Sequence, residues 1–186
     1  LLCAGATERP IAFANNDRPG VMLAGAVRSY VNRYGVAPGK SVTVFTNNDD
    51  GWRTASDLLA KGVQVRALID VREGVHPPDL TVTELITGGY VVDSSGRKEL
   101  SSITLKNGKK ISTDCLAVAG GWNPTVHLTC HQRGKPVWNK DILAFVPGGT
   151  LPEGMRVSGG ANGVFGLSSV IKSAAETTTE ILKDLG

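Results

Sequence analysis

The stretch 41–72 limits the possible folds more than any other part of this sequence, because it has the pattern of a strand, a turn, a helix and a second strand. The first strand is a short apolar run with Val42, Val44 and Phe45. The helix has apolar residues at steps of three and four, and the second strand is again apolar. Such a βαβ unit is the building block of nucleotide-binding folds. We therefore predict an α/β protein with a Rossmann-like domain.

The turn of this unit lacks the glycines of a phosphate site. A dinucleotide fingerprint needs glycines so that the backbone can approach the pyrophosphate, and from Asn47 to Gly51 only the last residue is a glycine. Asp49 and Asp50 suit the dipole at the helix N-terminus but would repel a phosphate. Asp70 ends the second strand about twenty residues later, where a ribose-binding acid stands. The two misplaced carboxylates outweigh this match, so we predict that the turn does not bind NAD.

Composition places the chain among ordinary globular proteins. It has 186 residues, of which 41% are hydrophobic and 20% charged, and its net charge is +3 without a long basic run. These values argue against nucleic acid as a partner, and no apolar run approaches the ~20 residues of a membrane span. The three cysteines are an odd number without CxxC spacing. We therefore expect a reducing, cytoplasmic setting.

Two similar motifs bracket the βαβ unit. Residues 1–6 are LLCAGA and residues 115–121 are CLAVAGG, each an apolar strand that ends in a turn of small residues. The bracketing predicts a Rossmann-like domain at 39–112, inserted into a partial, discontinuous outer nucleotide-binding domain made of 1–38 and 113–186.

The inserted domain is predicted to end in an antiparallel meander. A loop at 73–80, with two prolines, is followed by segments with a period of two that are joined by turn residues such as Asn107-Gly108. The predicted strands are 81–87, 90–93, 100–106 and 109–112.

The best candidate for a phosphate site follows a predicted strand at Met155–Ser158. The turn from Gly159 to Gly163 has three glycines and no acid, and a helical pattern runs from about 165 to 185. Its amides are placed to face a pyrophosphate at the helix N-terminus, although a plain strand-to-helix turn explains the pattern equally well. The predicted cofactor-binding residues are Gly5, Gly159, Gly160, Ala161, Gly163, Phe165 and Leu167.

Taken together, these features resemble the two-dinucleotide-binding flavoproteins, the architecture of glutathione and thioredoxin reductases. In that family a first nucleotide domain is interrupted by a second, and each return strand ends in an Ala-Thr-Gly-like turn. The matching segments here are CAGA at 3–6 and VAGG at 118–121. The family's late strand-Gly-Asp-helix motif is matched by SGGANG at 158–163, with Asn162 where an acid is usual.

Within this architecture the chain most resembles the α subunits of heterotetrameric sarcosine oxidases. The resemblance covers nearly the whole chain, and the TNNDD turn is its most specific part. The segments that carry it are AGATERPIAFANNDRPGVMLAGAVRSYVNRYGVAPGK, VFTNNDDGWRTASDL, AVAGGWNPTVHLTCHQRGKPVWN and AFVPGG. The family's α subunit is longer, with an amino-terminal GxGxxG unit and a carboxy-terminal part that binds tetrahydrofolate. The chain is therefore expected to be a middle fragment.

The resemblance implies a role in electron-transfer scaffolding and nucleotide binding. The family's complex of α, β, γ and δ subunits oxidises sarcosine to glycine, and oxygen becomes hydrogen peroxide. The methyl carbon leaves as formaldehyde or is captured by tetrahydrofolate. FAD in the β subunit oxidises the substrate, FMN lies between β and α, and α binds NAD. The isolated fragment is accordingly expected to be inactive and to hold no catalytic residue.

Other functions remain open at this point. One is a subunit of a related opine, hydroxyproline or amino-acid dehydrogenase, and another is a non-catalytic module that docks a partner subunit. A self-sufficient NAD-dependent enzyme is disfavoured because no GxGxxG is present. His127, Cys130 and His131 lie close together, but without a second ligand cluster they are a weak zinc signal, so no metal site is predicted.

Overall fold

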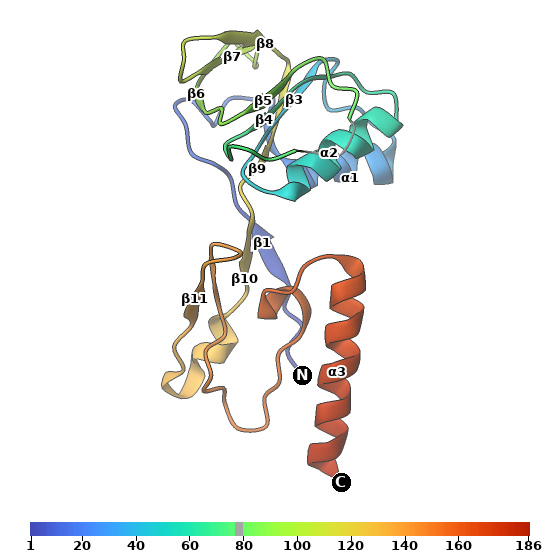
Figure 1. Ribbon diagram of the computed structural model, residues 1–186, viewed down its shortest axis with the longest axis vertical. Coiled ribbons are helices and arrows are strands. Elements are labelled where there is room, and N and C mark those ends of the chain that lie inside the picture. The colour runs from blue at the N-terminus through green and yellow to red at the C-terminus, as the bar shows by residue number, and fades with distance from the viewer. Residues whose placement is uncertain (77–79) are drawn as a thin grey trace. The chain divides into compact units, whose positions relative to one another are not determined.

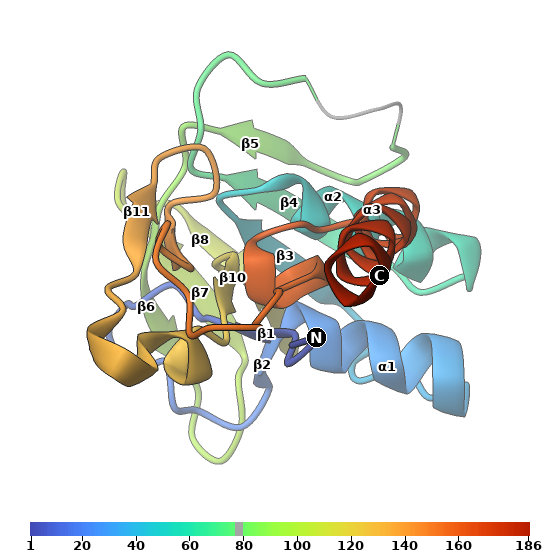
Figure 2. The ribbon, with the colours of Figure 1, turned by 90° about the horizontal axis from the view of Figure 1, so that it is seen from below.

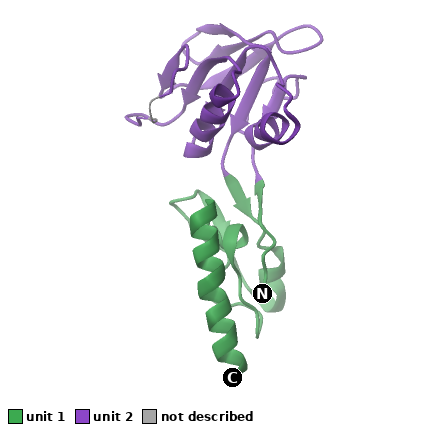
Figure 3. Ribbon diagram, turned by 90° about the vertical axis from the view of Figure 1, so that its right-hand side faces the viewer, with its two compact units in different colours: residues 1–7, 122–186 green, residues 8–121 purple. Residues whose placement is uncertain are grey.

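The computed structural model describes residues 1–76 and 80–186, and the chain forms two compact units (Figure 1). Unit 2 is continuous and contains Glu8–Gly121, whereas unit 1 contains Leu1–Thr7 and Trp122–Gly186 (Figure 3). Residues 77–79 of the predicted loop at 73–80 lie outside the described part.

Unit 2 is built on a parallel sheet with five strands in the order β2-β9-β3-β4-β5. The two central strands, β3 and β9, are buried at every residue, which fits the continuous apolar runs in their sequences. The strands are β2 (Val21–Leu23), β3 (Val42–Thr46), β4 (Val65–Asp70), β5 (Leu85–Thr87) and β9 (Cys115–Ala119).

Both faces of this sheet are covered by apolar layers. Helices α1 (Ala24–Tyr34) and α2 (Asp49–Ala60) pack on one face, against residues such as Val44. The antiparallel strands of the meander pack on the other, against residues such as Phe45 (Figure 2). These strands are β6 (Val91–Ser95), β7 (Ser102–Leu105) and β8 (Lys110–Ser112). Alternate residues of β3 thus enter opposite cores, as the pleat of a strand requires.

The structure corrects the predicted composition of the meander. The segment that was expected to be its first strand contains β5, which pairs in parallel with β4, with Leu68 opposite Leu85. The hairpin predicted at Asn107-Gly108 is present between β7 and β8, and Gly108 has the positive φ of 84° that such a turn favours.

The structure also divides the chain at other residues than the sequence predicted. Segment 21–34 and strand β9 were assigned to the outer domain, yet β9 lies between β2 and β3 in one sheet. Leu2 instead forms a parallel bridge with Val157, whereas Val118 is opposite Phe45. The two similar strand-glycine motifs therefore belong to different sheets, and the boundaries lie at residues 7–8 and 121–122 in place of 39 and 112.

Unit 1 has little sheet structure. Strand β1 (Ala6–Glu8) pairs with β10 (Trp122–Pro124), and β11 (Val137–Asn139) pairs with β12 (Ala144–Val146) in an antiparallel hairpin. Two 3-10 segments, η1 (His127–Arg133) and η2 (Gly159–Asn162), and the long helix α3 (Leu167–Leu185) complete it. Among the described residues, no helix combines the length and hydropathy that a membrane crossing requires.

A buried hydroxyl in unit 2 allows a test of what a polar group in the sheet costs in folding stability. Thr43 on β3 is fully buried, and its Oγ1 has no hydrogen-bond partner among the described residues. Replacing Thr43 with Val keeps the shape and the β-branching and removes the desolvation cost of the hydroxyl. We expect Thr43→Val to raise the free energy of unfolding by about 1 kcal/mol in urea titrations. A loss of stability would show that the hydroxyl is satisfied in solution.

Candidate nucleotide-binding sites

The turn between β3 and α2 in unit 2 has the spacing of a dinucleotide fingerprint but not its chemistry. Thr46, Asn48 and Gly51 stand at the three glycine positions of G-x-G-x-x-G. Gly51 keeps its packing role, because a Cβ there would lie 2.3 Å from the Cβ of Thr46. At the two positions that face a ligand, glycine has been replaced by residues with side chains.

The side chains of the turn form hydrogen bonds within the protein. The amide nitrogen Nδ2 of Asn48 donates to the carbonyl of Ala119 at 3.0 Å, and Nδ2 of Asn47 donates to the carbonyl of Gly120 at 3.3 Å. The Oδ1 of Asn48 accepts from the backbone N–H of Asp50 at 2.9 Å and so caps α2. These bonds tie the end of β3 to the end of β9, where open α/β sheets bind their ligands.

The acid at the end of β4 is also occupied. Asp70 is fully buried, and its Oδ2 accepts from the indole Nε1 of Trp52 at 2.8 Å and from Nη2 of Arg72 at 2.8 Å. Arg72 also reaches Asp49 at 2.9 Å, and its guanidinium carbon lies 4.7 Å from the centre of the Trp52 ring. The hydrogen bond to Asp70 raises the pKa of Arg72. A ribose hydroxyl would have to displace these partners from Asp70.

The second candidate site, in unit 1, has a different character. Gly159 has φ of +65°, and a Cβ added at Gly160 would lie 3.3 Å from the carbonyl carbon of Gly5. The backbone of Leu2 donates to Arg156 and accepts from Ser158, so the first strand runs beside the segment that leads into the turn. Gly5 and this turn were predicted to line the same ligand, and the structure brings the backbones of Gly5 and Gly160 close together. Their binding of a ligand stays a prediction.

The remaining predicted cofactor-binding residues differ in their exposure. Ala161 is fully buried, backbone included, so it presents no exposed atom to a ligand in this segment. Gly163 donates its N–H to the carbonyl of Gly160, and a Cβ there would meet the side chains of Val146 and Ile142. Leu167 is the first residue of α3 and is 78% exposed, while Phe165 is partly exposed between the turn and the helix.

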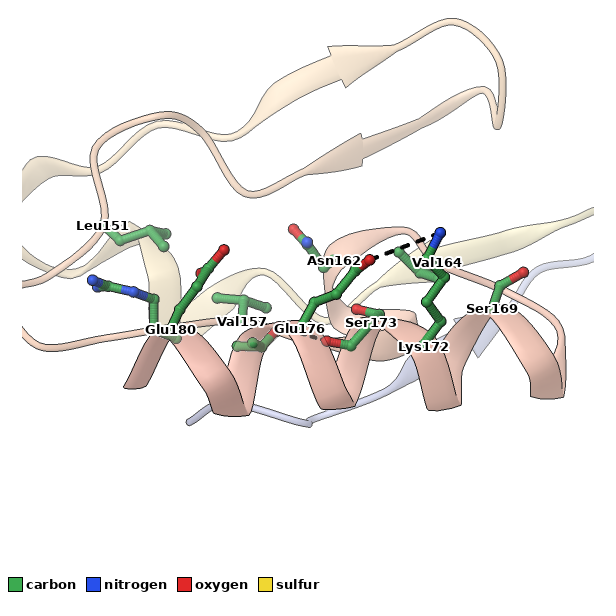
Figure 4. A pocket seen from close by; sticks show the side chains of 11 residues that line it. Leu151, Val157, Asn162, Val164, Ser169, Lys172, Ser173, Glu176 and Glu180 are labelled. Carbon is green, nitrogen blue, oxygen red and sulfur yellow. Dashed lines mark hydrogen bonds and ion pairs between the residues drawn. The ribbon is translucent and has the colours of Figure 1, made fainter. Parts of the chain in front are cut away.

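A cavity of about 520 Å³ lies beside this turn and along α3 (Figure 4). Asn162 enters it from the turn, and Ser169, Lys172 and Glu176 enter it from the helix, with Lys172 and Glu176 3.8 Å apart. Beneath them, the hydroxyls of Ser158 and Ser173 lie 3.0 Å apart and join the turn to α3. Sequence reasoning missed this contact because only the helical phase of Ser173 hints at it.

Unit 2 contains a half-buried carboxylate, Glu8. Both oxygens of Glu8 accept from the N–H of Gly25 in the first turn of α1, at 3.1 and 2.9 Å. Burial raises the pKa of Glu8 above 4.5, the hydrogen bond to Gly25 lowers it, and the charge of Asp50 raises it further.

As for metals, no group of three ligating side chains occurs in the described parts of the chain.

Curated proteins with similar sequences carry one name. The α subunit of sarcosine oxidase from Rhizobium meliloti (strain 1021) is 43% identical over 189 residues, which cover 100% of this chain and 19% of that protein. The same subunit from Corynebacterium sp. (strain P-1) is 41% identical over 190 residues, which cover 94% of this chain and 19% of that protein. The chain resembles the sarcosine oxidase α subunit along its whole length. It spans about a fifth of these relatives, and no family model matches it.

Solved structures share the fold. A HOCl-induced flavoprotein disulfide reductase from Escherichia coli has a TM-score of 0.69 and 15% identity, over 96% of this chain and 43% of its own. L-proline dehydrogenase from P. horikoshii has a TM-score of 0.66 and 21% identity, over 86% and 29%. Thioredoxin reductase from T. acidophilum has a TM-score of 0.62 and 13% identity, over 98% and 64%. The predicted α/β class, similar to glutathione and thioredoxin reductases, is confirmed.

The prediction that the β3–α2 turn does not bind NAD has a direct test. Asn48→Ala in the intact subunit removes the helix cap and the bond to Ala119. We expect the free energy of unfolding to fall by about 1–2 kcal/mol while the NAD content of the purified subunit is unchanged. Loss of NAD from a folded Asn48→Ala subunit would contradict the prediction.

Glu8 predicts a pH dependence of stability. Its pKa is raised in the folded state, so that state binds the proton more tightly than the unfolded chain does. The stability that Glu8 contributes is therefore greatest below 4.5 and declines as the pH rises through the folded-state pKa. In urea titrations at several pH values, we expect the free energy of unfolding of Glu8→Gln to show no such decline with rising pH. The control Glu153→Gln, at an exposed site, should show the same decline as the wild type. Identical pH profiles for wild type and Glu8→Gln would refute the assignment.

Proposed function

We propose that this chain is a segment of the α subunit of a multi-subunit sarcosine oxidase, and that it supplies part of an NAD site and part of a subunit interface. The observation that supports the proposal is similarity at 41–43% identity to two such subunits over nearly the whole chain. The complex would oxidise sarcosine to glycine and reduce oxygen to hydrogen peroxide. The methyl carbon would be released as formaldehyde, whose oxygen atom comes from water, or passed to tetrahydrofolate.

The residues of unit 1 fit the pyrophosphate of NAD. The turn from Gly159 to Gly163 contains no carboxylate, and Gly5 and Gly160 leave the backbone accessible where their chains meet. The N–H groups of Gly163 and Val164 are used inside the turn, and Ala161 is fully buried, so the candidate donor is the amide of Gly160. When bound, NAD would be a nucleotide ligand of this domain, and these residues would hold its phosphates.

The site would be completed by other parts of the subunit. Helix α3 exposes an apolar stripe, and Thr177 is its one buried residue among those described. The stripe contains Leu167, Ile171, Leu182 and Leu185. Burying it against the remainder of a nucleotide-binding domain accounts for its composition. FAD and FMN would belong to other parts of the complex, and tetrahydrofolate to a part of the subunit that this segment does not include.

A second function has some support. The likeness to L-proline dehydrogenase from P. horikoshii, over 86% of this chain, favours a subunit of an amino-acid dehydrogenase as the alternative. In either case we assign no substrate catalysis to this segment, and we expect no sarcosine oxidation by the segment alone.

Substitution of Gly160 tests the proposal. In the intact subunit, Gly160→Asp adds a charge and a side chain where the phosphate would approach. We expect it to lower the NAD content of the purified protein severalfold. Gly160→Ala adds bulk alone and separates the two causes. The control is Gly149→Asp, in the same unit, because Gly149 is exposed and a Cβ there meets nothing within 4 Å. Unchanged NAD content in a folded Gly160→Asp subunit would remove this site from consideration.

A further inference from the structure

The hairpin β11–β12 in unit 1 presents two aromatic rings to solvent. Trp138 and Phe145 are opposite each other in the register of the hairpin, with ring centroids 5.1 Å apart in an edge-to-face arrangement. They are 54% and 52% exposed. The neighbouring residue Ala144 is buried, so the hairpin has an inner face toward unit 1 and an outer face formed by the ring pair.

The surroundings of the ring pair are apolar and basic. Leu143, just before β12, is about half exposed, and so is Val137 on the other face of β11. Three cations near the hairpin are exposed: Arg133 at the end of η1, and Lys135 and Lys140 in the adjoining loops. Asp141 is the single acid from 131 to 143. None of these three cations forms an ion pair in the part of the chain that the structure describes.

The backbone around the hairpin is strained. Within the described residues, four non-glycine residues have positive φ, and three of them flank this surface: Gln132, Arg133 and Leu143. For a bulky residue such as Leu143 this conformation is unfavourable by about 1–2 kcal/mol. Leu143 nevertheless remains half exposed, so the strain is not offset by burying its side chain in this unit.

We propose that the outer face of β11–β12 docks a partner subunit of the oxidase, one that presents an apolar pocket rimmed by carboxylates. Aromatic rings and arginine dominate binding energy at protein interfaces, and unpaired cations at the rim select an acidic partner. Figure 1 shows β11 and α3 on different sides of unit 1, so the hairpin surface is distinct from the apolar stripe of α3. The inference rests on the proposed function, because it takes the partner from the same complex.

Co-production of the intact subunit with the other oxidase subunits tests this surface. The first variant is the double substitution Trp138→Ser and Phe145→Ser, and the second is Lys135→Glu with Lys140→Glu, which leaves the rings in place. We expect each to weaken assembly at least about tenfold, measured by size-exclusion chromatography with mass determination over a dilution series. Added salt should weaken the wild-type complex more than the charge variant.

The matched control is Tyr30→Ser with Tyr34→Ser on α1 of unit 2. These rings are also exposed, at 45% and 62%, and lie 6.2 Å apart, but they are on another surface. We expect this variant to assemble like the wild type. Wild-type assembly by both hairpin variants would overturn the proposal. So would protection of Trp138 from fluorescence quenching in the α subunit alone, or self-association of that subunit through the hairpin.

The NAD content of each variant separates this inference from the proposed function. Hairpin variants that retain NAD but fail to assemble support the docking surface. A subunit that assembles normally and never contains NAD contradicts the NAD site and leaves the docking surface standing.

Discussion

The parallel pairing of β3 with β9 is the constraint on which unit 2 depends. Both strands are buried throughout, so each contributes alternate residues to the helical layer and to the meander layer. The pairing also brings the carbonyls of Ala119 and Gly120 within reach of Asn47 and Asn48. In a nucleotide-binding sheet the same juxtaposition opens a crevice for a ligand. Here the asparagine side chains of the turn form hydrogen bonds to these carbonyls, which supports the prediction that the turn does not bind NAD.

Unit 1 depends on contacts of another kind. Its turn at 159–163 is held by glycine conformations, by the close approach to Gly5 and by the Ser158–Ser173 contact. Its long helix buries almost none of its apolar residues within the unit. A helix with such a face is stabilised mainly by tertiary packing, which is the ground for the proposal that other parts of the subunit cover this stripe. The predicted nucleotide site thus lies in the unit whose long helix is the more exposed.

Local patterns in the sequence predicted local structure well. The strand-turn-helix-strand pattern of 41–72 corresponds to β3, α2 and β4, with Asn48 as the N-cap of α2. Gly5 and Gly160 were both named from the sequence as neighbours of one ligand, and the structure places their backbones close together, while the ligand site itself stays a prediction. The domain boundaries could not be predicted from the sequence, because β2 has only three residues, too few to show a strand periodicity. Its place is set by pairing with β9, about ninety residues away, and such pairing depends on tertiary contacts.

The closure at Asp70 shows why residue types at a fingerprint position do not settle ligand binding. An acid at the end of the second strand is available to a ligand when its oxygens face a crevice, and is paired within the protein when they are buried. A buried carboxylate is strongly unfavourable unless it is paired and hydrogen-bonded. Arg72, two residues later, supplies the charge, and Trp52 in the first turn of α2 supplies the further donor. Because Asp70 already accepts hydrogen bonds from these partners, a ribose hydroxyl would gain a bond to Asp70 only by breaking one of them. An arginine at this spacing, together with a tryptophan in the first helical turn, therefore predicts a closed site in other chains of this architecture.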